Sequence, residues 1–357
     1  MIVMVRSFAK INLGLRIGAA RPDGFHDLLT VYQTIGLHDV VHVSVKRGTG
    51  IEIRCNDALV PKDESNTCWR IVEETMRALR AKGRVVIEIE KRLPVQGGLG
   101  GASSNAVAAM LGLERALKKA LPAPEKLQAA ADVGSDLPLF LIGGTVLGIG
   151  HGEQVYPLPD LPATGCVIVT SDVGVSTPKA FAEWDRQCAI SNNPTSRAKT
   201  AREMGHPLPY GPTQPESAPM QAQGKLTVSD ASDRINLLSR GFSAWLSEPY
   251  SSAPSGSWAR GGRAGNPLLW LVRAGIENDF EQVVFPEYPQ LREGKEALLR
   301  AGAKYASLSG SGSALYGLFA SRGSAAQAAA KLKKQGWAAR ATTTLPRRQY
   351  WRRIFDC

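Results

Sequence analysis

Alternating apolar and polar residues predict β-strands in the N-terminal third of the chain. Residues 5–17 and 84–91 both place apolar side chains at every second position. Because successive side chains of a strand point to opposite faces, each segment is expected to be a strand with one buried face. In the first strand Lys10 and Asn12 share the polar face, so we expect them to point together into a cleft.

Apolar stretches with helical spacing predict helices between further strands. The expected helices cover residues 63–82, 103–119, 124–133, 289–301 and 324–335. Short apolar segments at 41–45 and 51–53, on either side of a turn at 47–50, are expected to form a hairpin. Strands are also expected on both sides of a turn at Gly310 and Gly312. A chain of 357 residues is long enough for two such mixed domains.

Residues 185–264 break this pattern. They are rich in Pro, Gly and Ser, as in Pro207-Leu-Pro209 and Pro254-Ser-Gly256. Such a composition cannot bury enough apolar surface, which predicts a disordered or loosely folded insertion. Within it, only residues 234–246 have the pattern of a helix.

A run of small residues from Pro94 to Asn105 separates the strand predicted at 84–91 from the helix predicted at 103–119. Its four glycines let the backbone approach a ligand closely and present N–H groups to it. The N-terminus of the following helix attracts anions. The pattern indicates a phosphate-binding loop, with a simple flexible loop as the alternative. The residues able to cap the helix are Ser103, Ser104 and Asn105.

This loop differs from two common nucleotide-binding motifs. It ends in Ala102-Ser103-Ser104 and lacks the lysine of a P-loop. A dinucleotide-binding fingerprint needs an acidic residue about 20 residues further on. Glu125 stands near that spacing, but it begins a predicted helix. Both motifs are therefore excluded.

Three segments, taken in order along the chain, resemble the GHMP kinases over residues 5–183 and 265–345. They are Ser7-Phe-Ala-Lys10-Ile-Asn12 with Asp23-Gly-Phe-His26-Asp-Leu, the glycine loop, and Ser307-Leu-Ser-Gly310-Ser-Gly312-Ser313. The segment that begins at Asp23 is similar to the branch that phosphorylates the 2-hydroxyl of a cytidine-diphosphate-linked methylerythritol in isoprenoid precursor biosynthesis. The resemblance implies a kinase that uses ATP and Mg²⁺, with ATP and this small molecule as its partners.

The resemblance also implies an α+β fold of two domains. Residues 1–162 would form an ATP-binding domain similar to the second domain of ribosomal protein S5. Residues 163–345 would form a ferredoxin-like domain, interrupted by the insertion at 185–264, and residues 346–357 a basic tail. Ala102 and Gln96 depart from the glycines common in the family's loop. A methyl group at 102 is tolerated only where φ is not positive.

In a GHMP kinase Asp136 would accept the proton of the substrate hydroxyl, and Lys10 would be its charge partner. From the residues alone, Asp136 is a candidate helix N-cap and Lys10 a solvated charge. The resemblance places Asn66, Pro94, Val95, Gln96, Gly97, Gly98, Leu99, Gly100, Gly101, Ala102, Ser103 and Ser104 at the nucleotide. It places Asn12, Phe25, His26, Tyr32 and Thr177 at the substrate, with His26 on cytosine and Tyr32 or Phe25 stacked on the ring. Asn66 is an equally good helix cap. Gly310 and Gly312 would support the phosphate loop or form an ordinary hairpin turn.

The formal net charge of +11 invites a nucleic-acid interpretation. Residues 331–357 hold eight Lys and Arg against one Asp, away from the glycine loop. We interpret them as a solvated basic tail, with attraction of RNA or another anion as the alternative. A kinase acting on a different alcohol and a nucleic-acid-binding module are the competing functions.

Several further features bound the function. No apolar run reaches ~18 residues, so no membrane span is expected. Five scattered cysteines without a Cys-x-x-Cys pair indicate neither a zinc site nor a disulfide framework, which fits a reducing cytoplasm. No acidic residue stands out as a Mg²⁺ ligand, and the oligomeric state is left open.

Overall fold

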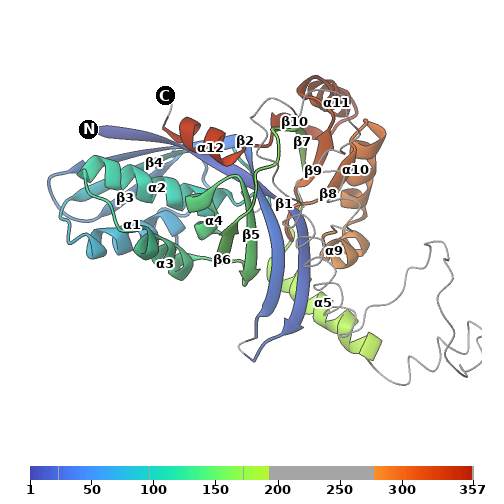
Figure 1. Ribbon diagram of the computed structural model, residues 1–357, viewed down its shortest axis with the longest axis horizontal. Coiled ribbons are helices and arrows are strands. Elements are labelled where there is room, and N and C mark those ends of the chain that lie inside the picture. The colour runs from blue at the N-terminus through green and yellow to red at the C-terminus, as the bar shows by residue number, and fades with distance from the viewer. Residues whose placement is uncertain (23, 96, 172, 193–276, 356–357) are drawn as a thin grey trace, which may run out of the picture.

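The computed structural model of the chain describes residues 1–355 except 23, 96, 172 and 193–276. Its strands form two sheets with helices packed against them (Figure 1). The first sheet and its helices are β1 (Ile2–Ala20), β2 (His26–Lys46), β3 (Ile51–Cys55), α1 (Thr67–Ala78), β4 (Arg84–Glu90), α2 (Gly101–Leu117), α3 (Ala123–Val133), α4 (Leu137–Ile142), β5 (Thr145–Gly150) and β6 (Gln154–Pro157). The later elements are β7 (Gly165–Thr170), α5 (Thr177–Asn192), α9 (Glu281–Glu287), α10 (Pro289–Arg300), β8 (Tyr305–Leu308), β9 (Leu315–Phe319), α11 (Arg322–Lys334), β10 (Ala338–Thr343) and α12 (Arg347–Ile354).

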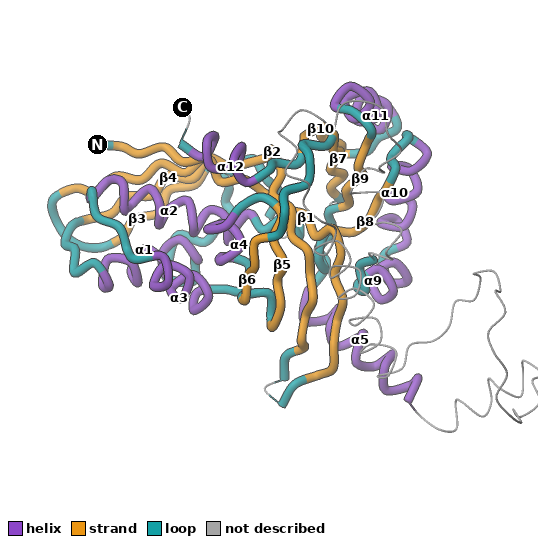
Figure 2. The backbone as a smooth tube through the Cα atoms, viewed as in Figure 1, coloured by secondary structure: helices purple, strands orange, loops and turns teal. Residues whose placement is uncertain are grey.

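Strands β1 and β2 are the longest elements, and they pair antiparallel from Ile2↔Ser44 to Ala20↔His26. On its other edge β2 pairs with β5 and with β4. The register of β1 shifts between Phe8 and Lys10, as at a β-bulge. Figure 2 shows the two strands curving from the first sheet past the second.

The predicted hairpin between residues 41–45 and 51–53 is wrong. Strand β4 lies between β2 and β3, so the two predicted partners do not pair. β3 instead pairs parallel with β4, from Ile51↔Val85 to Cys55↔Ile89, and α1 makes the crossover. A parallel pair needs such a crossover connection. The short turn at 47–50 favours a hairpin when only neighbouring residues are considered, so the local sequence does not reveal the parallel pairing.

The second sheet has the order β10-β7-β9-β8 with antiparallel pairs throughout. Its inner face packs on β1 and β2 in a shared core that includes Ile11, Leu13 and Val31 from one side. Ile168 and Tyr316 contribute from the other side. The alternation in residues 5–17 correctly predicts a buried apolar face, of which Ile11 and Leu13 lie in this shared core. The polar face is buried as well over residues 7–17, which the alternation does not predict.

The insertion predicted at 185–264 starts too early. Residues 185–192 are the end of α5. The buried Trp184 of the same helix packs in a core with Val167, Val169 and Phe280. The remainder of the insertion, with its possible helix at 234–246, lies outside the described residues. Within the described ranges no helix is long and apolar enough to cross a membrane.

The solvated basic tail is also wrong. Residues 347–354 form α12, which packs beside α4 and the first sheet (Figure 1). Tyr350 and Ile354, one helical turn apart, are fully buried in the core that includes Phe8 of β1 and Phe140 of α4, which we call the first core. Of the basic residues of this segment, Arg348 and Arg352 are exposed, whereas Arg347 donates to carbonyl oxygens of the fold and Arg353 lies over the Phe8 ring.

Candidate active site

The glycine loop between β4 and α2 contains two residues with left-handed backbone conformation. Gly98 has φ +74° and Gly100 has φ +68°. A side chain at Gly98 would also overlap the carbonyl oxygen of Ser309, so only glycine fits this position. Ala102 has no positive φ because it lies in the first turn of α2. Its methyl group is therefore accommodated without backbone strain.

The turn between β8 and β9 supports this loop from the second sheet. The Ser309 hydroxyl donates to the Gly98 carbonyl oxygen at 3.0 Å, and the Ala314 N–H donates to that of Gly97 at 3.1 Å. Gly312 lies so close that a Cβ there would stand 2.5 Å from the Gly98 nitrogen. The structure thus favours the supporting role for this turn over an ordinary hairpin turn.

Helix α2 begins at Gly101 without a side-chain cap, since Gly100 occupies the N-cap position. The expected caps Ser103, Ser104 and Asn105 are wrong, because all three lie inside the helix. The Ser104 hydroxyl donates to the Phe8 carbonyl oxygen at 2.7 Å, and Asn105 accepts from the Ser7 hydroxyl at 2.6 Å. These bonds seat α2 on β1.

A first cavity of ≈ 330 Å³ lies beside the loop. Its lining includes the predicted nucleotide-binding residues Asn66, Pro94, Val95, Gly97, Gly98, Leu99, Gly100, Gly101, Ala102 and Ser103. Gln96 lies outside the described residues, and Ser104 does not line this cavity. Asn66 is also a helix cap, since its Oδ1 accepts from the Cys68 N–H at 2.8 Å.

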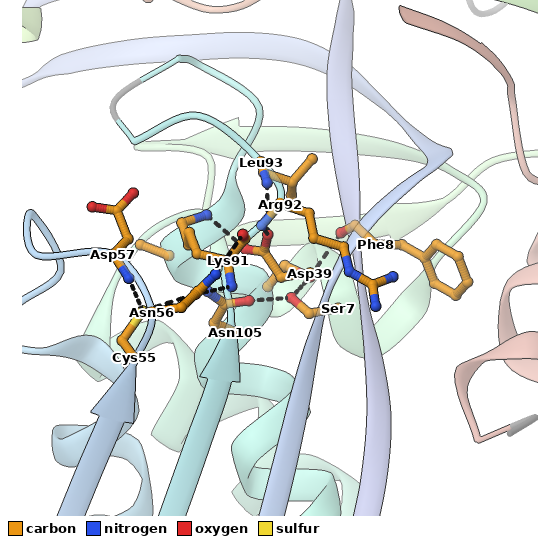
Figure 3. Close-up of polar contacts among 12 residues, drawn as sticks. Ser7, Phe8, Asp39, Cys55, Asn56, Asp57, Lys91, Arg92, Leu93 and Asn105 are labelled. Atoms are coloured by element: carbon orange, nitrogen blue, oxygen red, sulfur yellow. Dashed lines mark hydrogen bonds and ion pairs between the residues drawn. The ribbon is translucent and has the colours of Figure 1, made fainter.

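A buried carboxylate fixes the chain that enters the glycine loop (Figure 3). Asp39 is fully buried and accepts from the Lys91 ammonium at 2.6 Å. It also accepts from the backbone N–H groups of Arg92 and Leu93 at 2.6 and 2.7 Å. Lys91 lines the first cavity and lies near the start of α2, where a Cβ on Gly101 would stand 3.2 Å from its Nζ. The Lys91–Asp39 ion pair thus lies at the wall of this cavity, where its two charges compensate each other.

A second cavity of ≈ 630 Å³ lies on the other side of the loop. It is lined by all the predicted catalytic and substrate residues, namely Lys10, Asn12, Phe25, His26, Tyr32, Asp136 and Thr177. Gly98 and Gly100 line both cavities. The glycine loop therefore forms the wall that the two cavities share.

Lys10 and Asp136 meet at this wall. The Lys10 Nζ lies 3.3 Å from Asp136 Oδ2 and donates to Asn12 Oδ1 at 2.7 Å. The Asn12 amide donates to the Thr30 hydroxyl at 2.8 Å, which fixes its orientation. The expectation that Lys10 and Asn12 point together into a cleft is confirmed, and Lys10 is buried rather than solvated.

Asp136 stands at the N-cap position of α4, but its side chain makes no cap hydrogen bond. Its Oδ1 instead accepts from the Tyr32 hydroxyl at 3.1 Å. Burial and the neighbouring Asp136 carboxylate raise the pKa of Tyr32 well above its ordinary value. Tyr32 is therefore a protonated donor toward Asp136 at any physiological pH.

The far end of the second cavity is aromatic. His26 is buried and stacks on Phe181 with ring centroids 5.1 Å apart and planes 15° apart. Its Nε2 lies 2.7 Å from Asp185 Oδ1. Phe25 is 59% exposed and stacks on His151. This end of the cavity offers flat aromatic faces next to an imidazole that Asp185 orients.

Comparison with known proteins places the chain in a family. A model of the GHMP kinases N terminal domain matches residues 66–144, and one of the GHMP kinases C terminal region matches residues 268–337. The 4-diphosphocytidyl-2-C-methyl-D-erythritol kinase of Solibacter usitatus is 35% identical over 318 residues, which cover 89% of this chain and 81% of the relative. The chain belongs to the GHMP kinase family. The kinase of the same name from Synechococcus elongatus is 32% identical over 92% of this chain and 89% of its own length.

Solved structures agree with this assignment of the GHMP kinase fold. The crystal structure of a 4-(cytidine 5'-diphospho)-2C-methyl-D-erythritol kinase is 25% identical, with a TM-score of 0.64, and covers 96% of this chain and 98% of that one. The homoserine kinase of Cytophaga hutchinsonii has a TM-score of 0.61 at 19% identity, covering 97% of this chain and 95% of that one. The second likeness shows the fold alone.

Several residues that line the cavities of this GHMP kinase cannot be recognised from the sequence. Lys91 lines the first cavity, while Phe181 and Asp185 line the second cavity. No local pattern marks these three residues, because each becomes part of the site only through tertiary contacts. Ser311, from the Gly310-Ser-Gly312 turn, also lines the second cavity, and its hydroxyl lies 2.6 Å from that of Thr177.

Residues suited to a closed metal cage are absent from the part of the chain that the structure describes, which has no group of three His, Cys, Asp or Glu side chains. Mg²⁺ usually keeps several waters and binds through one or two protein groups together with substrate phosphates. The Ser103 hydroxyl on the first cavity fits that kind of partial site.

Proposed function

We propose that this chain transfers the γ-phosphate of ATP to the 2-hydroxyl of 4-(cytidine 5'-diphospho)-2-C-methyl-D-erythritol in isoprenoid precursor biosynthesis. The Lys10–Asp136 pair carries the proposal, because it stands at the glycine loop where the two cavities meet. Phosphoryl transfer requires chiefly that donor and acceptor be positioned and that developing charge be stabilised. The names of the relatives support the choice of substrate.

In the proposed reaction, Asp136 accepts the proton of the substrate hydroxyl while the hydroxyl oxygen attacks the γ-phosphorus of ATP. The bond between that phosphorus and the β–γ bridging oxygen breaks, and ADP leaves. The Lys10 ammonium, 3.3 Å away, stabilises the carboxylate before transfer and the phosphoryl charge during it. Backbone N–H groups of the glycine loop and the N-terminus of α2 bind the phosphates of ATP. Mg²⁺, when bound with ATP, supplies further charge neutralisation, and the Ser103 hydroxyl is its proposed protein contact.

The cytidine moiety is assigned to the aromatic end of the second cavity. Phe25 is the exposed aromatic ring there and is proposed to stack on the base. Tyr32 is buried, and its hydroxyl is engaged by Asp136, so we assign it to the catalytic end rather than to stacking. His26 and Thr177 are proposed to bind the base and the adjoining part of the substrate.

An activity assay with a matched variant tests this proposal. ADP formation is measured with ATP, Mg²⁺ and the cytidine-diphosphate substrate, for the wild type and for Asp136→Asn. Loss of a general base lowers kcat by about 10²–10⁴-fold, while KM for ATP should stay within a small factor. ADP formation with another alcohol only would be consistent with a GHMP kinase but would contradict the proposed substrate. Full activity of a folded Asp136→Asn protein would contradict the assignment of Asp136 as the general base.

We also place the enzyme in the cytoplasm. Cys55, Cys68 and Cys166 are free thiols, although cysteines in a secreted chain would commonly be paired.

A further inference from the structure

The glycine loop leaves β4 through residues 91–93, which we call the neck of the loop. The neck lies against the place where the loop ends, since a Cβ on Gly101 would stand 3.2 Å from the Lys91 Nζ and 3.6 Å from the Leu93 Cδ1. The loop therefore leaves and rejoins the fold at one place. The groups that hold the neck set the position of the residues that follow it.

Asp39 of β2 holds the neck from a neighbouring strand (Figure 3). Its Oδ1 accepts from the N–H groups of Arg92 and Leu93 at 2.6 and 2.7 Å, and its Oδ2 takes the Lys91 ammonium at 2.6 Å. The side chains of Asp39 and Lys91 are 0% and 6% exposed. Asn56, which follows β3, adds an acceptor at 2.7 Å for the Lys91 N–H. All three backbone N–H groups of the neck are thus bound by side chains from other strands.

The rest of the loop is held by other contacts. The turn between β8 and β9 holds its middle, as described above. The Lys10 N–H donates to the Leu99 carbonyl oxygen at 3.0 Å and holds its end. Pro94 and Val95 come directly after the neck, and they line the first cavity but not the second. A shift of the neck would therefore displace a wall of the first cavity and leave Lys10 in place.

Stability alone does not account for a charged group buried at this position. The desolvation of two buried charges offsets most of their attraction, so a buried ion pair contributes little net stability. A carboxylate oxygen that accepts from two successive N–H groups does fix the direction of the chain. Backbone donors of a loop that is already ordered lose less entropy when they bind phosphates.

We propose that Asp39 is a positioning residue of the nucleotide site, which sets the affinity for the nucleotide by fixing the neck of the glycine loop. Asp39 itself lines neither cavity, so it acts through residues 91–93. The inference rests on the use of ATP proposed above. The transfer step should not depend on it, because the Lys10–Asp136 pair is held by other contacts.

Two double variants that differ only in the acceptor test this role. Both carry Lys91→Met, so that neither leaves a buried ammonium without its carboxylate. Asp39→Asn keeps an oxygen for the Arg92 and Leu93 N–H groups, whereas Asp39→Ala removes it. Calorimetric titration with ADP should show about tenfold weaker binding to the Ala variant than to the Asn variant. That ratio corresponds to one lost hydrogen bond to a charged phosphate.

Steady-state kinetics separates a positioning role from a general structural one. KM for ATP should differ between the two variants by the same ratio of about tenfold, because only nucleotide binding is weakened. The kcat values, and KM for the cytidine substrate, should agree within about twofold.

Glu114 of α2 provides a matched control at the far end of that helix. It is also buried, pairs with the Lys126 ammonium at 2.7 Å and accepts from the Leu121 N–H at 2.7 Å. Glu114→Gln and Glu114→Ala are compared in a Lys126→Met background. Urea unfolding should show a loss of stability similar to that of the Asp39 pair, while the affinity for ADP should change less than about twofold.

Three outcomes would overturn the proposal. The first is equal affinity of the two Asp39 variants for ADP. The second is an equal loss of ADP affinity in the Glu114 pair, which would make the effect a consequence of lower stability. The third is a rise in KM for the cytidine substrate as large as that for ATP. A wild type that binds ADP but phosphorylates no cytidine substrate would refute the proposed function alone, and a tenfold difference between the Asp39 variants would still support the role of Asp39.

Discussion

Asp136 is held by two groups that act on different oxygens. Lys10 lies 3.3 Å from Oδ2 and Tyr32 donates to Oδ1 at 3.1 Å, while a third of the Asp136 side chain remains exposed toward the cavity. The carboxyl group is thus oriented on both oxygens, yet open to a substrate. Its environment resembles that of an oriented base more than that of a structural ion pair.

Removal of the Tyr32 hydroxyl should loosen this arrangement. Tyr32→Phe keeps the ring but loses the donor to Asp136, so we expect kcat to fall about 3–10-fold, the effect of one hydrogen bond to a charged group. The pKa of Tyr32 is raised by burial and by Asp136. The ratio of wild-type to variant kcat should therefore be constant from pH 6 to pH 10. A pH–rate profile in which this ratio falls toward one below pH 10 would contradict the assignment.

Asp185 should act through His26. A carboxylate accepts only, so the 2.7 Å contact requires that His26 Nε2 carry the proton. Asp185→Asn should raise KM for the cytidine substrate about 3–10-fold and leave kcat within about twofold, as expected when uniform binding is lost. Glu183→Gln changes the same charge in the same helix, away from His26, and is the control. Equal kinetics for both variants would remove Asp185 from substrate binding.

At the scale of elements, α12 completes the short helix that carries Asp136. Tyr350, Trp351 and Arg347 donate to the carbonyl oxygens of Phe140, Ile142 and Gly143 at 2.7, 2.9 and 3.1 Å. The last carbonyl groups of a helix have no partner within it. Because α4 has only six residues, donors from α12 satisfy a large share of its C-terminal end.

Loss of one of these donors should affect both stability and catalysis. Trp351→Phe leaves the Ile142 carbonyl oxygen without its indole donor and should lower the free energy of unfolding by about 1–2 kcal/mol. A displaced α4 moves Asp136, so kcat should fall more than KM rises. Urea unfolding and steady-state kinetics measure the two effects, with Arg348→Gln as the control on the same helix. A destabilised variant with unchanged kcat would limit α12 to a structural role.

The elements differ in how much the sequence reveals of them. The strand of Lys10, the glycine loop and the helix after it follow from local alternation and composition, which survive in the structure. The strand order β3-β4-β2 cannot be predicted in this way, because tertiary packing determines which strands pair. For α12 a signal exists: Tyr350 and Ile354 are four residues apart, as on one face of a helix. The arginines around these two residues obscure this apolar spacing and make the segment resemble an exposed basic tail. Asp39, Lys91 and Asp185 enter the site through long-range contacts that no local pattern encodes.

For the whole molecule, buried tyrosines predict sensitivity to alkali. Burial raises the pKa values of Tyr32, Tyr305, Tyr316 and Tyr350 above the ordinary 10.0. Above about pH 10 the unfolded chain loses these protons while the folded chain keeps them, so the unfolded state becomes favoured as pH rises. Each tyrosine then lowers the free energy of unfolding by about 1.4 kcal/mol per pH unit. The raised pKa of Cys68, about 12, extends the loss downward toward pH 9.

Urea unfolding at pH 8, 9, 10 and 10.5 checks this prediction. The free energy of unfolding should fall most steeply in the last interval. Tyr305→Phe removes one contributor and should make that fall shallower. A free energy that is the same at pH 8 and pH 10.5 would contradict it.

The continuous pair β1–β2 has a consequence for how substrates are enclosed. The two strands run along both sheets, and β1 is tied to the C-terminal part by backbone hydrogen bonds from Leu15 to Glu277 and from Asp279 to Leu15, at 2.9 and 3.0 Å. A rotation of one sheet away from the other would have to break this ladder and expose their shared core. The two sheets are therefore not expected to rotate apart as rigid bodies to admit a substrate. We therefore expect side chains at the edge of the second cavity, such as the exposed Phe25, to admit the substrate without movement of the strand that carries Lys10.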